Sequence, residues 1–596
     1  MPKALLINPE FPPSYWSGKY ALEFIGRKSA NPPLSLLTLA ALFPPHFELK
    51  VVDLNVEPLK NQDLAWADYA FITGMIVQRE SMREVISRCK AAFLPVIVGG
   101  PYATSFPEDF AGVDHFVLGE VEDFFLDFLC DLEAGRAGKL YEPARDARGN
   151  YIKPDISRVP PPRYDLLDVF QYGSMSLQFS RGCPFDCEFC DITKLYGRVP
   201  RTKGNSQMLA ELNVLYQTGW RGAVFLVDDN FIGNRKRARE LLPDITAWQK
   251  QHGYPFRLYT EASINLAEMP ELMDLMVQAG FDMVFLGLET PNSEALLKAN
   301  KGQNVKKGGA DYLLRAVRTI QAHGLEVTGG FILGLDGDGE DAFDAQINFV
   351  QQAGIPTAMV GLLTPVKGTA LYERYQREGR LIDTCHSGNN VSCTLTYVPE
   401  MDPQTLVSGY KRVLGTLYDP GLRSYFERCL TLFKHWRLRP HCQRQIGKDE
   451  IRALFRSLGR QIFSRQGPAY LKFLGQVLLR FPSMLPEAVR MGIMGYHYQR
   501  VTSQQVLVDD FCCLLEVELE RVKKMIARFK ESRAQRLSVV QRDIQRVFAD
   551  IQRRYEEINH DFRAAVRDAV HSFRTSVRAQ IEQFSLALQV DVPTFE

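Results

Sequence analysis

Short apolar runs alternate with longer amphipathic segments along the first 140 residues. The runs are bounded by Gly, Pro, Asn or Asp, which is typical of buried strands in a parallel sheet. The alternation predicts an α/β domain with a doubly wound sheet, in which ligands bind outside the carboxyl ends of the strands. The predicted strands are Ala4–Asn8, Leu49–Leu54, Tyr69–Gly74, Val96–Gly99 and His115–Gly119.

A second alternation begins at Ser174 and continues to about Thr369. Its six strand–helix units predict a partial TIM-type (βα)6 barrel, which carries its chemistry on the loops after the strands. We expect a first domain over residues 1–140, a Pro-rich linker over 141–170 and a barrel domain over 171–400. The predicted barrel strands are Ser174–Phe179, Ala223–Val227, Arg257–Glu261, Met283–Leu288, Glu326–Leu333 and Ala358–Leu363.

The strand–helix rhythm stops after Leu371, and the remaining pattern predicts an all-α region. Residues 421–500 contain 15 Lys and Arg against 4 Asp and Glu, with Phe and Trp interleaved. One interpretation is a helical domain over 401–500 that caps the barrel and exposes basic faces to solvent. The other is a surface for an anionic membrane or a lipid substrate, which basic amphipathic helices with aromatic residues favour.

The last stretch of the chain, residues 501–596, has a continuous helical apolar stripe and no glycine or proline before Pro593. From Leu537 to Leu588 the stripe takes 14 steps over 51 residues, or 3.64 residues per step, which is close to a straight α-helix. We expect one or two long helices that need a partner surface. The partner is either the same chain or a second copy in a homo-oligomer.

Composition and charge narrow the class of protein. Of 596 residues, 45% are hydrophobic and 24% are charged, which excludes a wholly disordered or fibrous chain. Lys and Arg number 71 against 70 Asp and Glu, so a general nucleic-acid binder is not expected. Eleven cysteines are too few for a disulfide framework, and neither a signal peptide nor a long apolar span is visible. We expect a cytoplasmic protein, with peripheral contact at the inner membrane face as the alternative.

Three cysteines give the strongest chemical signal. Cys183, Cys187 and Cys190 lie in a loop directly after the first predicted barrel strand. Thiolates hold iron–sulfur clusters, and a cubane with three protein thiolates leaves one iron open to a further ligand. A structural zinc site usually has four protein ligands, and no second cysteine pair lies nearby. The spacing therefore favours a cluster over zinc or buried structural thiols.

The motif Cys183-Pro-Phe-Asp-Cys187-Glu-Phe-Cys190 resembles the CxxxCxxC signature of the radical SAM enzymes. The resemblance implies a [4Fe–4S] cluster whose open iron chelates S-adenosylmethionine (SAM), and reductive cleavage of SAM to a 5′-deoxyadenosyl radical. It also implies a flavodoxin-type reductase as electron donor. Val227-Asp-Asp-Asn230 stands where the commoner family motif is Gly-Gly-Glu. The SAM-contacting positions implied by the resemblance are Phe189, Asp228, Asp229, Glu261, Glu289, Gly330, Ile332 and Gly334.

The first domain resembles the Rossmann-like cobalamin-binding domain that precedes the barrel in one radical SAM subgroup. Domains that ligate cobalt through histidine carry Asp-x-His-x-x-Gly, and here Asn55 replaces that histidine after Asp53. The resemblance therefore implies base-off cobalamin without a histidine ligand. The positions implied to contact cobalamin are Asn55, Met75, Val77, Gln78, Gly99, Gly100 and Pro101.

From about residue 30 to 420 the chain resembles hopanoid C-2 methylases and their relatives, in stretches such as Leu195-Tyr-Gly-Arg198 and Val227–Asn234. Beyond residue 420 we find no counterpart in that resemblance. It implies methylation of an unactivated carbon in a lipid-like or other small-molecule substrate. A radical cyclisation or rearrangement without methyl transfer is the enzymatic alternative, and a cofactor-binding scaffold is the non-enzymatic one. The sequence assigns no residue to a catalytic role beyond cofactor binding.

Overall fold

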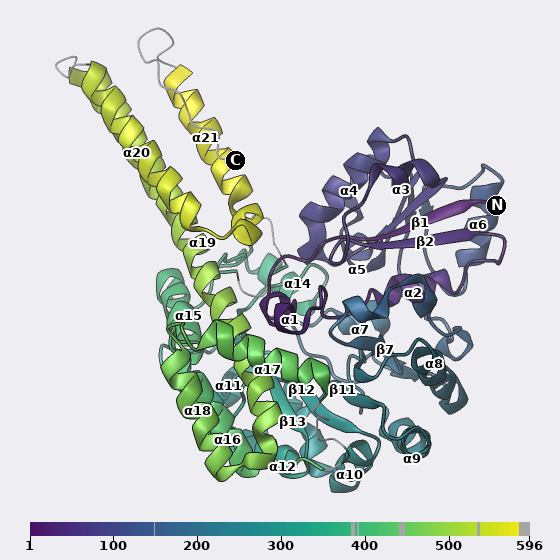
Figure 1. The fold of residues 1–596 in the computed structure, drawn as a ribbon. Helices are drawn as coiled ribbons and strands as arrows, with labels where there is room; N and C mark the ends of the chain where they lie inside the picture. The colour runs from purple at the N-terminus through teal and green to yellow at the C-terminus, as the bar shows by residue number, and fades with distance from the viewer. Residues whose placement is uncertain are drawn as a thin grey trace. The chain divides into compact units, whose positions relative to one another are not determined.

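The computed structural model describes residues 1–147, 149–382, 388–389, 392–439, 441, 447–532 and 537–582. The chain divides into two compact units (Figure 1). One unit comprises Met1–Asn390 and Thr394–His497, and the other comprises Val391–Cys393 and Tyr498–Glu596. Both sheets belong to the first unit.

The N-terminal sheet is parallel throughout, in the order β2-β1-β3-β4-β5-β6. The predicted doubly wound fold is confirmed, and a short edge strand adds to the five predicted strands. Because β2 and β3 flank β1 on opposite sides, the strand order reverses at β1, and ligands of such sheets bind at this switch point. The strands are β1 (Lys3–Asn8), β2 (Glu48–Asp53), β3 (Tyr69–Thr73), β4 (Val96–Gly99), β5 (His115–Val117) and β6 (Leu140–Tyr141).

Helices surround this sheet, and apolar side chains bury it. On one side, Val85 and Ile86 of α4 pack with Leu5 and Val98 of the strands. These helices are α2 (Leu34–Ala40), α3 (Asn61–Trp66), α4 (Arg79–Ala91), α5 (Gly100–Ser105) and α6 (Phe125–Glu133). The short helix α1 (Lys19–Ile25) instead contacts Arg456 and Arg460, which follow the barrel. Short 3-10 turns are η1 (Ile76–Gln78) and η2 (Pro107–Asp109), and the linker region contains η3 (Ile156–Arg158), η4 (Tyr164–Leu166) and η5 (Val169–Gln171).

The second sheet has six parallel strands in the order β14-β13-β12-β11-β10-β7. No described residues join the edge strands β7 and β14, so the barrel is open, as the pattern predicts. The strands are β7 (Met175–Leu177), β10 (Gly222–Leu226), β11 (Phe256–Ala262), β12 (Phe281–Glu289), β13 (Glu326–Leu333) and β14 (Ala358–Leu362). A separate hairpin pairs β8 (Ser180–Arg181) with β9 (Arg201–Thr202).

The strands of the barrel are joined by helices and turns. The connecting helices and 3-10 turns are α7 (Ile192–Tyr196), α8 (Asn205–Gln217), α9 (Arg235–Gln251), η6 (Ile264–Glu268), α10 (Pro270–Gln278), α11 (Ser293–Lys298), η7 (Gly302–Asn304), α12 (Gly309–Ala322) and α13 (Ala342–Ala353). The helix α14 (Ala370–Arg377) follows the last strand.

Helices after the barrel carry the basic and aromatic residues of 421–500. Arg428 is buried and donates to the carbonyls of Ile355 and Leu417, so part of the positive charge anchors a helix to the barrel. Phe426 and Phe473 are buried and stacked at 4.7 Å, whereas other aromatic side chains stay exposed. The helices are α15 (Pro403–Leu417), α16 (Arg423–His435), α17 (Lys448–Gln461) and α18 (Gly467–Arg480), followed by η9 (Pro482–Met484).

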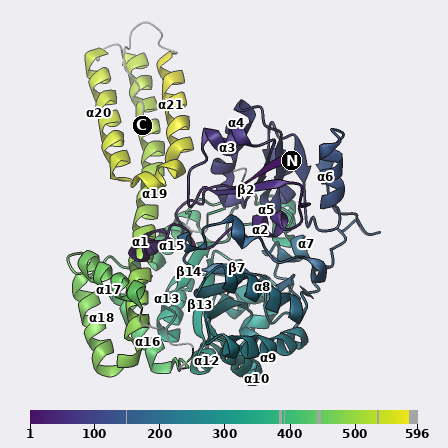
Figure 2. The same ribbon diagram turned by 45° about the vertical axis from the view of Figure 1, so that its right-hand side comes forward.

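The second unit is built from the end of α19 (Leu485–Ser532), α20 (Leu537–Glu557), η10 (His560–Val566) and α21 (Arg567–Glu582), which lie side by side (Figure 2). The predicted stripe is interrupted at η10, so it forms the two helices α20 and α21 instead of one continuous helix. Its aromatic side chains meet within the chain, with Phe511 and Tyr555 at 5.9 Å and Phe548 and Phe573 at 6.3 Å. The same chain thus supplies the partner surface. Among the described helices, none is long and apolar enough to cross a membrane.

Candidate cofactor site

The three motif cysteines lie in the loop between β8 and α7. Cys183, Cys187 and Cys190 are each partly exposed, and the chain turns at Cys187, whose carbonyl accepts from the Cys190 amide at 3.1 Å. Gly182 has φ +99°, and a Cβ there would lie 2.8 Å from the carbonyl of Gly197, so only glycine fits before Cys183. Burial raises the pKa of the Cys183 thiol and raises that of Cys190 to about 12. No three described His, Cys, Asp or Glu side chains converge as ligands of a single ion.

Two adjacent carboxylates after β10 hold the start of this loop. Asp228 accepts from the amides of Phe179 and Ser180 at 2.8 and 2.9 Å and from the Ser180 hydroxyl at 2.7 Å. Asp229 accepts from the Gly182 amide at 2.8 Å. Burial raises the pKa of Asp228 to about 7 and that of Asp229 to about 6. Both residues were expected to contact SAM, and in the structure their carboxylates bind the backbone of the cysteine loop.

Glu261, at the end of β11, lies in the same part of the barrel. Its carboxylate has no hydrogen-bond or ion-pair partner among the described residues. Burial, reinforced by Asp229 and Asp228, raises its pKa to about 8. Nearby, the amide of Asn230 contacts Cys183 Sγ at 3.9 Å and Ser263 Oγ at 3.2 Å. A partly buried carboxylate without a partner among the described residues is suited to a cationic ligand group.

Glu289, at the end of β12, has a partner. It forms a buried ion pair with Lys301, whose ammonium also lies 5.6 Å from the ring centre of Phe189. Burial opposes the charge of Lys301, but Glu289 and the neighbouring thiols keep its pKa above the ordinary value. This places Glu289 and Phe189 together beside the cysteine loop.

The three predicted positions on β13 and directly after it contact different neighbours. Ile332 packs in one apolar cluster with Phe189, next to the cysteine loop. A Cβ at Gly330 would lie 2.9 Å from the Phe285 ring. At Gly334 the carbonyl accepts from the Tyr397 hydroxyl at 2.5 Å, so Gly334 packs against the segment that follows the barrel. The structure therefore brings Ile332 to the cysteines and gives the two glycines other contacts.

The carboxyl edge of the N-terminal sheet contains a cavity of about 260 Å³. Gly99 and Gly100 line it, and neither position tolerates a side chain. A Cβ at Gly99 would lie 2.6 Å from the Val117 carbonyl, and one at Gly100, where φ is +87°, would collide with the Thr73 hydroxyl. Arg181, from the hairpin that leads into the cysteine loop, lines the same cavity. The glycine pair and the β8–β9 hairpin that leads into the cysteine loop thus border one space.

The other predicted cobalamin positions lie beside the first strands. Asn55 donates to Asp53 at 2.7 Å and accepts from the Phe11 amide at 2.8 Å. Gln78 donates to the Pro9 carbonyl at 2.6 Å and accepts from the Met75 amide at 2.8 Å. The Met75 side chain is exposed, and Val77 borders Gly388. Pro101 is the second residue of α5, directly after the glycine pair.

Comparison with known proteins identifies the family. The radical SAM superfamily model matches residues 177–350, and a domain of unknown function, DUF4070, matches residues 369–507. An uncharacterized methyltransferase of Synechocystis sp. is 44% identical over 72% of this chain and 77% of its own length. Hopanoid C-2 methylase of Rhodopseudomonas palustris is 34% identical over 76% of this chain and 83% of its own length. This chain belongs to the radical SAM superfamily.

Solved radical SAM structures share the fold. The cobalamin-dependent SAM radical enzyme OxsB, with aqua-cobalamin bound, aligns with a TM-score of 0.55 at 14% identity, over 85% of this chain and 80% of its own. The methyltransferase TsrM of Kitasatospora setae, with cobalamin and a [4Fe–4S] cluster bound, aligns with a TM-score of 0.53 at 16% identity, over 84% of this chain and all of its own. The DUF4070 match also corrects, for residues 421–507, the expectation that the chain has no counterpart beyond residue 420.

The cysteine loop is held by residues that belong to none of the motifs identified in the sequence. Arg181 and Arg201 of the β8–β9 hairpin bind Glu120, which follows β5 of the first sheet, at 3.0 and 2.8 Å. On the other side, Arg374 of α14 forms two hydrogen bonds with Glu188, at 2.6 and 2.9 Å.

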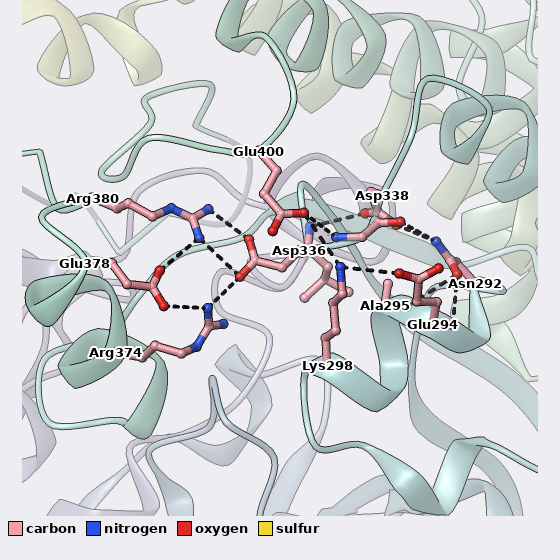
Figure 3. Close-up of polar contacts among 12 residues, drawn as sticks. Asn292, Glu294, Ala295, Lys298, Asp336, Asp338, Arg374, Glu378, Arg380 and Glu400 are labelled. Carbon is pink, nitrogen blue, oxygen red and sulfur yellow. Dashed lines mark hydrogen bonds and ion pairs between the residues drawn. The ribbon is translucent and has the colours of Figure 1, made fainter.

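Asp336 fixes the position of Arg374. It accepts from Arg374 at 2.7 Å and from Arg380 at 2.8 Å, and Figure 3 shows its carboxylate between the two guanidinium groups. Long side chains from distant parts of the sequence meet here. Neither the periodicity of apolar residues nor the spacing of motif residues predicts ion pairs between such distant positions.

Proposed function

We propose that this radical SAM enzyme is a cobalamin-dependent C-methyltransferase. We assign a [4Fe–4S] cluster to Cys183, Cys187 and Cys190, and a cobalamin to the cavity at Gly99 and Gly100. The observation that carries the proposal is that Arg181, two positions before Cys183, lines the same cavity as Gly99 and Gly100. Cobalt and iron chemistry would therefore face the same substrate.

The residues present fit these groups. Three thiols in one loop are a donor set for a cluster with one open iron, and the bare glycine edge lets a nucleotide tail approach the sheet. When bound, these groups supply reductive cleavage of SAM, hydrogen abstraction by the resulting radical and delivery of a methyl group. Glu261 would pair with the SAM ammonium, and Asp228 and Asp229 keep the cysteine loop in place. A flavodoxin-type reductase as electron donor is part of the proposal.

We assign the cobalamin a base-off state without a histidine ligand. Asn55 stands at the position that carries the ligand in histidine-ligated domains, and its amide is engaged by Asp53 and Phe11. The histidines of residues 1–140 are His46 and His115, which contact Glu133 and the Gly138 carbonyl.

Anaerobic reconstitution with iron, sulfide and hydroxocobalamin, followed by incubation with SAM and dithionite, tests the function. We expect a corrin spectrum retained after desalting, and formation of both 5′-deoxyadenosine and S-adenosylhomocysteine. Cys187→Ala should lose 5′-deoxyadenosine, whereas Cys130→Ala, at an exposed position on α6, should not. Deoxyadenosine without S-adenosylhomocysteine would favour a rearrangement, and a loaded cluster without SAM cleavage would favour a scaffold.

For the substrate, we propose a lipid-like molecule that the enzyme meets at an anionic membrane surface. Residues 451–486 contain five Arg, one Lys and no acidic residue. Ile451 and Phe455 lie four residues apart on α17, and Phe463 follows the helix eight residues later; Phe455 is 68% and Phe463 91% exposed. Basic residues with exposed aromatics bind anionic interfaces by combining charge attraction with apolar insertion.

Co-sedimentation with vesicles tests this surface. The full chain should bind phosphatidylcholine vesicles that contain phosphatidylglycerol and not vesicles of phosphatidylcholine alone. The variant F455S/F463S should lose most of this binding. Phe93→Ser, at an equally exposed phenylalanine of the first domain, should keep it. Equal binding by F455S/F463S and wild type would refute the surface, and the methyltransferase assignment would stand independently.

A further inference from the structure

The segment 299–304, between α11 and α12, lies directly against the cysteine loop. Ala299 accepts from the Glu188 amide at 3.0 Å, and the Asn300 side chain donates to the Asp186 carbonyl at 2.7 Å. Gln303 reaches a motif cysteine itself, with its Nε2 donating to Cys187 Sγ at 3.3 Å. This is a normal distance for a hydrogen bond to sulfur, where N–H···O contacts are shorter.

The segment is anchored, so Gln303 is held in place. Asn304 is buried, and its amide donates to the carbonyls of Gly287 and Leu288 at 3.0 and 3.1 Å, at the end of β12. Lys301 is fixed by its ion pair with Glu289 and by its amide, which donates to the Leu296 carbonyl at 2.8 Å. Contacts on both sides of Gln303 therefore fix the backbone that carries it.

We propose that Gln303 tunes the reduction potential of the cluster that we assign to Cys183, Cys187 and Cys190, through its hydrogen bond to the Cys187 sulfur. The inference rests on the proposed function. A reduced cluster carries one more negative charge than an oxidised one, and part of that charge lies on the thiolate sulfurs. An N–H donor aimed at sulfur stabilises the reduced state more than the oxidised state and so raises the potential.

Gln303 is the neutral donor that acts locally on Cys187. The nearby cation of Lys301 is compensated by Glu289, so the pair adds little net charge. Among the described residues, the second side-chain donor to a motif cysteine is Asn230, which contacts Cys183 at 3.9 Å and shares its amide with Ser263. Substitution of Gln303 therefore tests a single hydrogen bond.

The experiment is a redox titration followed by electron paramagnetic resonance, on the full chain reconstituted anaerobically without SAM. Each cluster takes one electron from the reductant. We expect the midpoint potential to fall in the order wild type, Gln303→Leu, Gln303→Glu. Leucine removes the donor, and glutamate removes it and adds negative charge. Gln352→Leu, at an exposed position on α13, should match the wild type.

Iron and sulfide content per chain separates this inference from the proposed function. A wild-type chain that takes up no cluster would overturn both. A filled wild-type cluster with an unchanged or raised potential in Gln303→Leu would overturn the tuning role alone. If Gln303→Leu does not fill, Gln303→Met, which keeps the length and lacks the donor, decides in its place. Failure of both to fill, with a wild-type circular dichroism spectrum, would also overturn the inference, because Gln303 would then be needed to hold the cluster.

Discussion

Arg374 should control the stability of the cysteine loop. Its guanidinium binds both oxygens of Glu188, the residue between Cys187 and Phe189, and also Asp336. The Glu188 backbone is engaged too, since its carbonyl accepts from the Leu371 amide at 2.9 Å. Arg374→Met keeps most of the side-chain volume and removes every one of these charged hydrogen bonds.

The cost follows from burial. The Glu188 side chain is 15% exposed and that of Asp336 is 5% exposed, so water cannot fully replace the guanidinium. Breaking a buried ion pair costs about 3–5 kcal/mol. Because Arg374 is itself 27% exposed, we reduce this to about 2–3 kcal/mol of local stability. At 1.4 kcal/mol per factor of ten, that corresponds to roughly 30- to 150-fold faster opening of the loop.

Hydrogen–deuterium exchange measures this opening, since unfolding of so long a chain is not expected to be two-state. Peptides that contain the Glu188 and Leu371 amides should exchange faster in Arg374→Met by the factor given above. The control is Arg412→Met, which breaks a pair with Asp344 whose partners are 50% and 63% exposed and should change exchange by less than about threefold. Glu188→Gln and the double variant complete a cycle, with a coupling of about 1–2 kcal/mol expected. Loop exchange within twofold of wild type in Arg374→Met would refute the reasoning.

Three further predictions follow from groups on other elements. Gly100→Ala should lose corrin retention after desalting, because its Cβ would meet Thr73 at a left-handed backbone position. Gly204→Ala places its Cβ in open space and should keep the corrin. Retention by both variants would contradict the cavity assignment. SAM binding near pH 7 should release a proton, because the SAM ammonium lowers the pKa of Glu261 from its raised value of about 8. Calorimetry in buffers of different ionisation enthalpy should show this release in the wild type and not in Glu261→Gln. Equal proton release by the two proteins would exclude this carboxylate as the source. Burial lowers the pKa of His497 to about 4, against about 6.5 for an ordinary histidine. The contribution of neutral His497 to stability is therefore intact above about pH 6.5 and falls by roughly 3 kcal/mol in total as the pH drops through 4. Melting curves of His497→Gln should show a smaller loss of stability over that range, and parallel curves for the two proteins would argue against it.

The pattern of apolar and polar residues along the chain was sufficient to predict most strands of the two six-stranded sheets. Buried parallel strands are short apolar runs between Gly, Pro, Asn and Asp, so β1 to β5 and β10 to β14 could be predicted within a few residues. The edge strand β6 was missed because Leu140–Tyr141 is too short to show a pattern and lies beside the Pro-rich linker. The interruption of the long stripe at His560–Val566 was also missed, because no Gly or Pro marks it. There the stripe stays apolar while the helix changes type.

Only part of the candidate site could be predicted from the sequence. The cysteines and the glycine pair are visible from sequence because their chemistry depends on residue type at short spacing. What Asp228 does could not be predicted, since a carboxylate at a strand end can face a ligand or bind a nearby backbone, and here its oxygens are engaged by Phe179 and Ser180. Its position in the motif was informative, but its partners depend on how the loop folds back.

Three groups of contacts that orient the cysteine loop join residues far apart in sequence. Glu188 and Arg374 are separated by 186 positions, Asp186 and Asn300 by 114, and Arg181 and Glu120 by 61. These contacts come from three different parts of the chain: the DUF4070 segment, the loop after β12 and the first sheet. A loop held from three sides keeps its geometry only when all three are folded. We therefore infer that the first sheet and α14 stabilise the arrangement of the thiols, and that a truncated barrel without them would hold the cysteines less well.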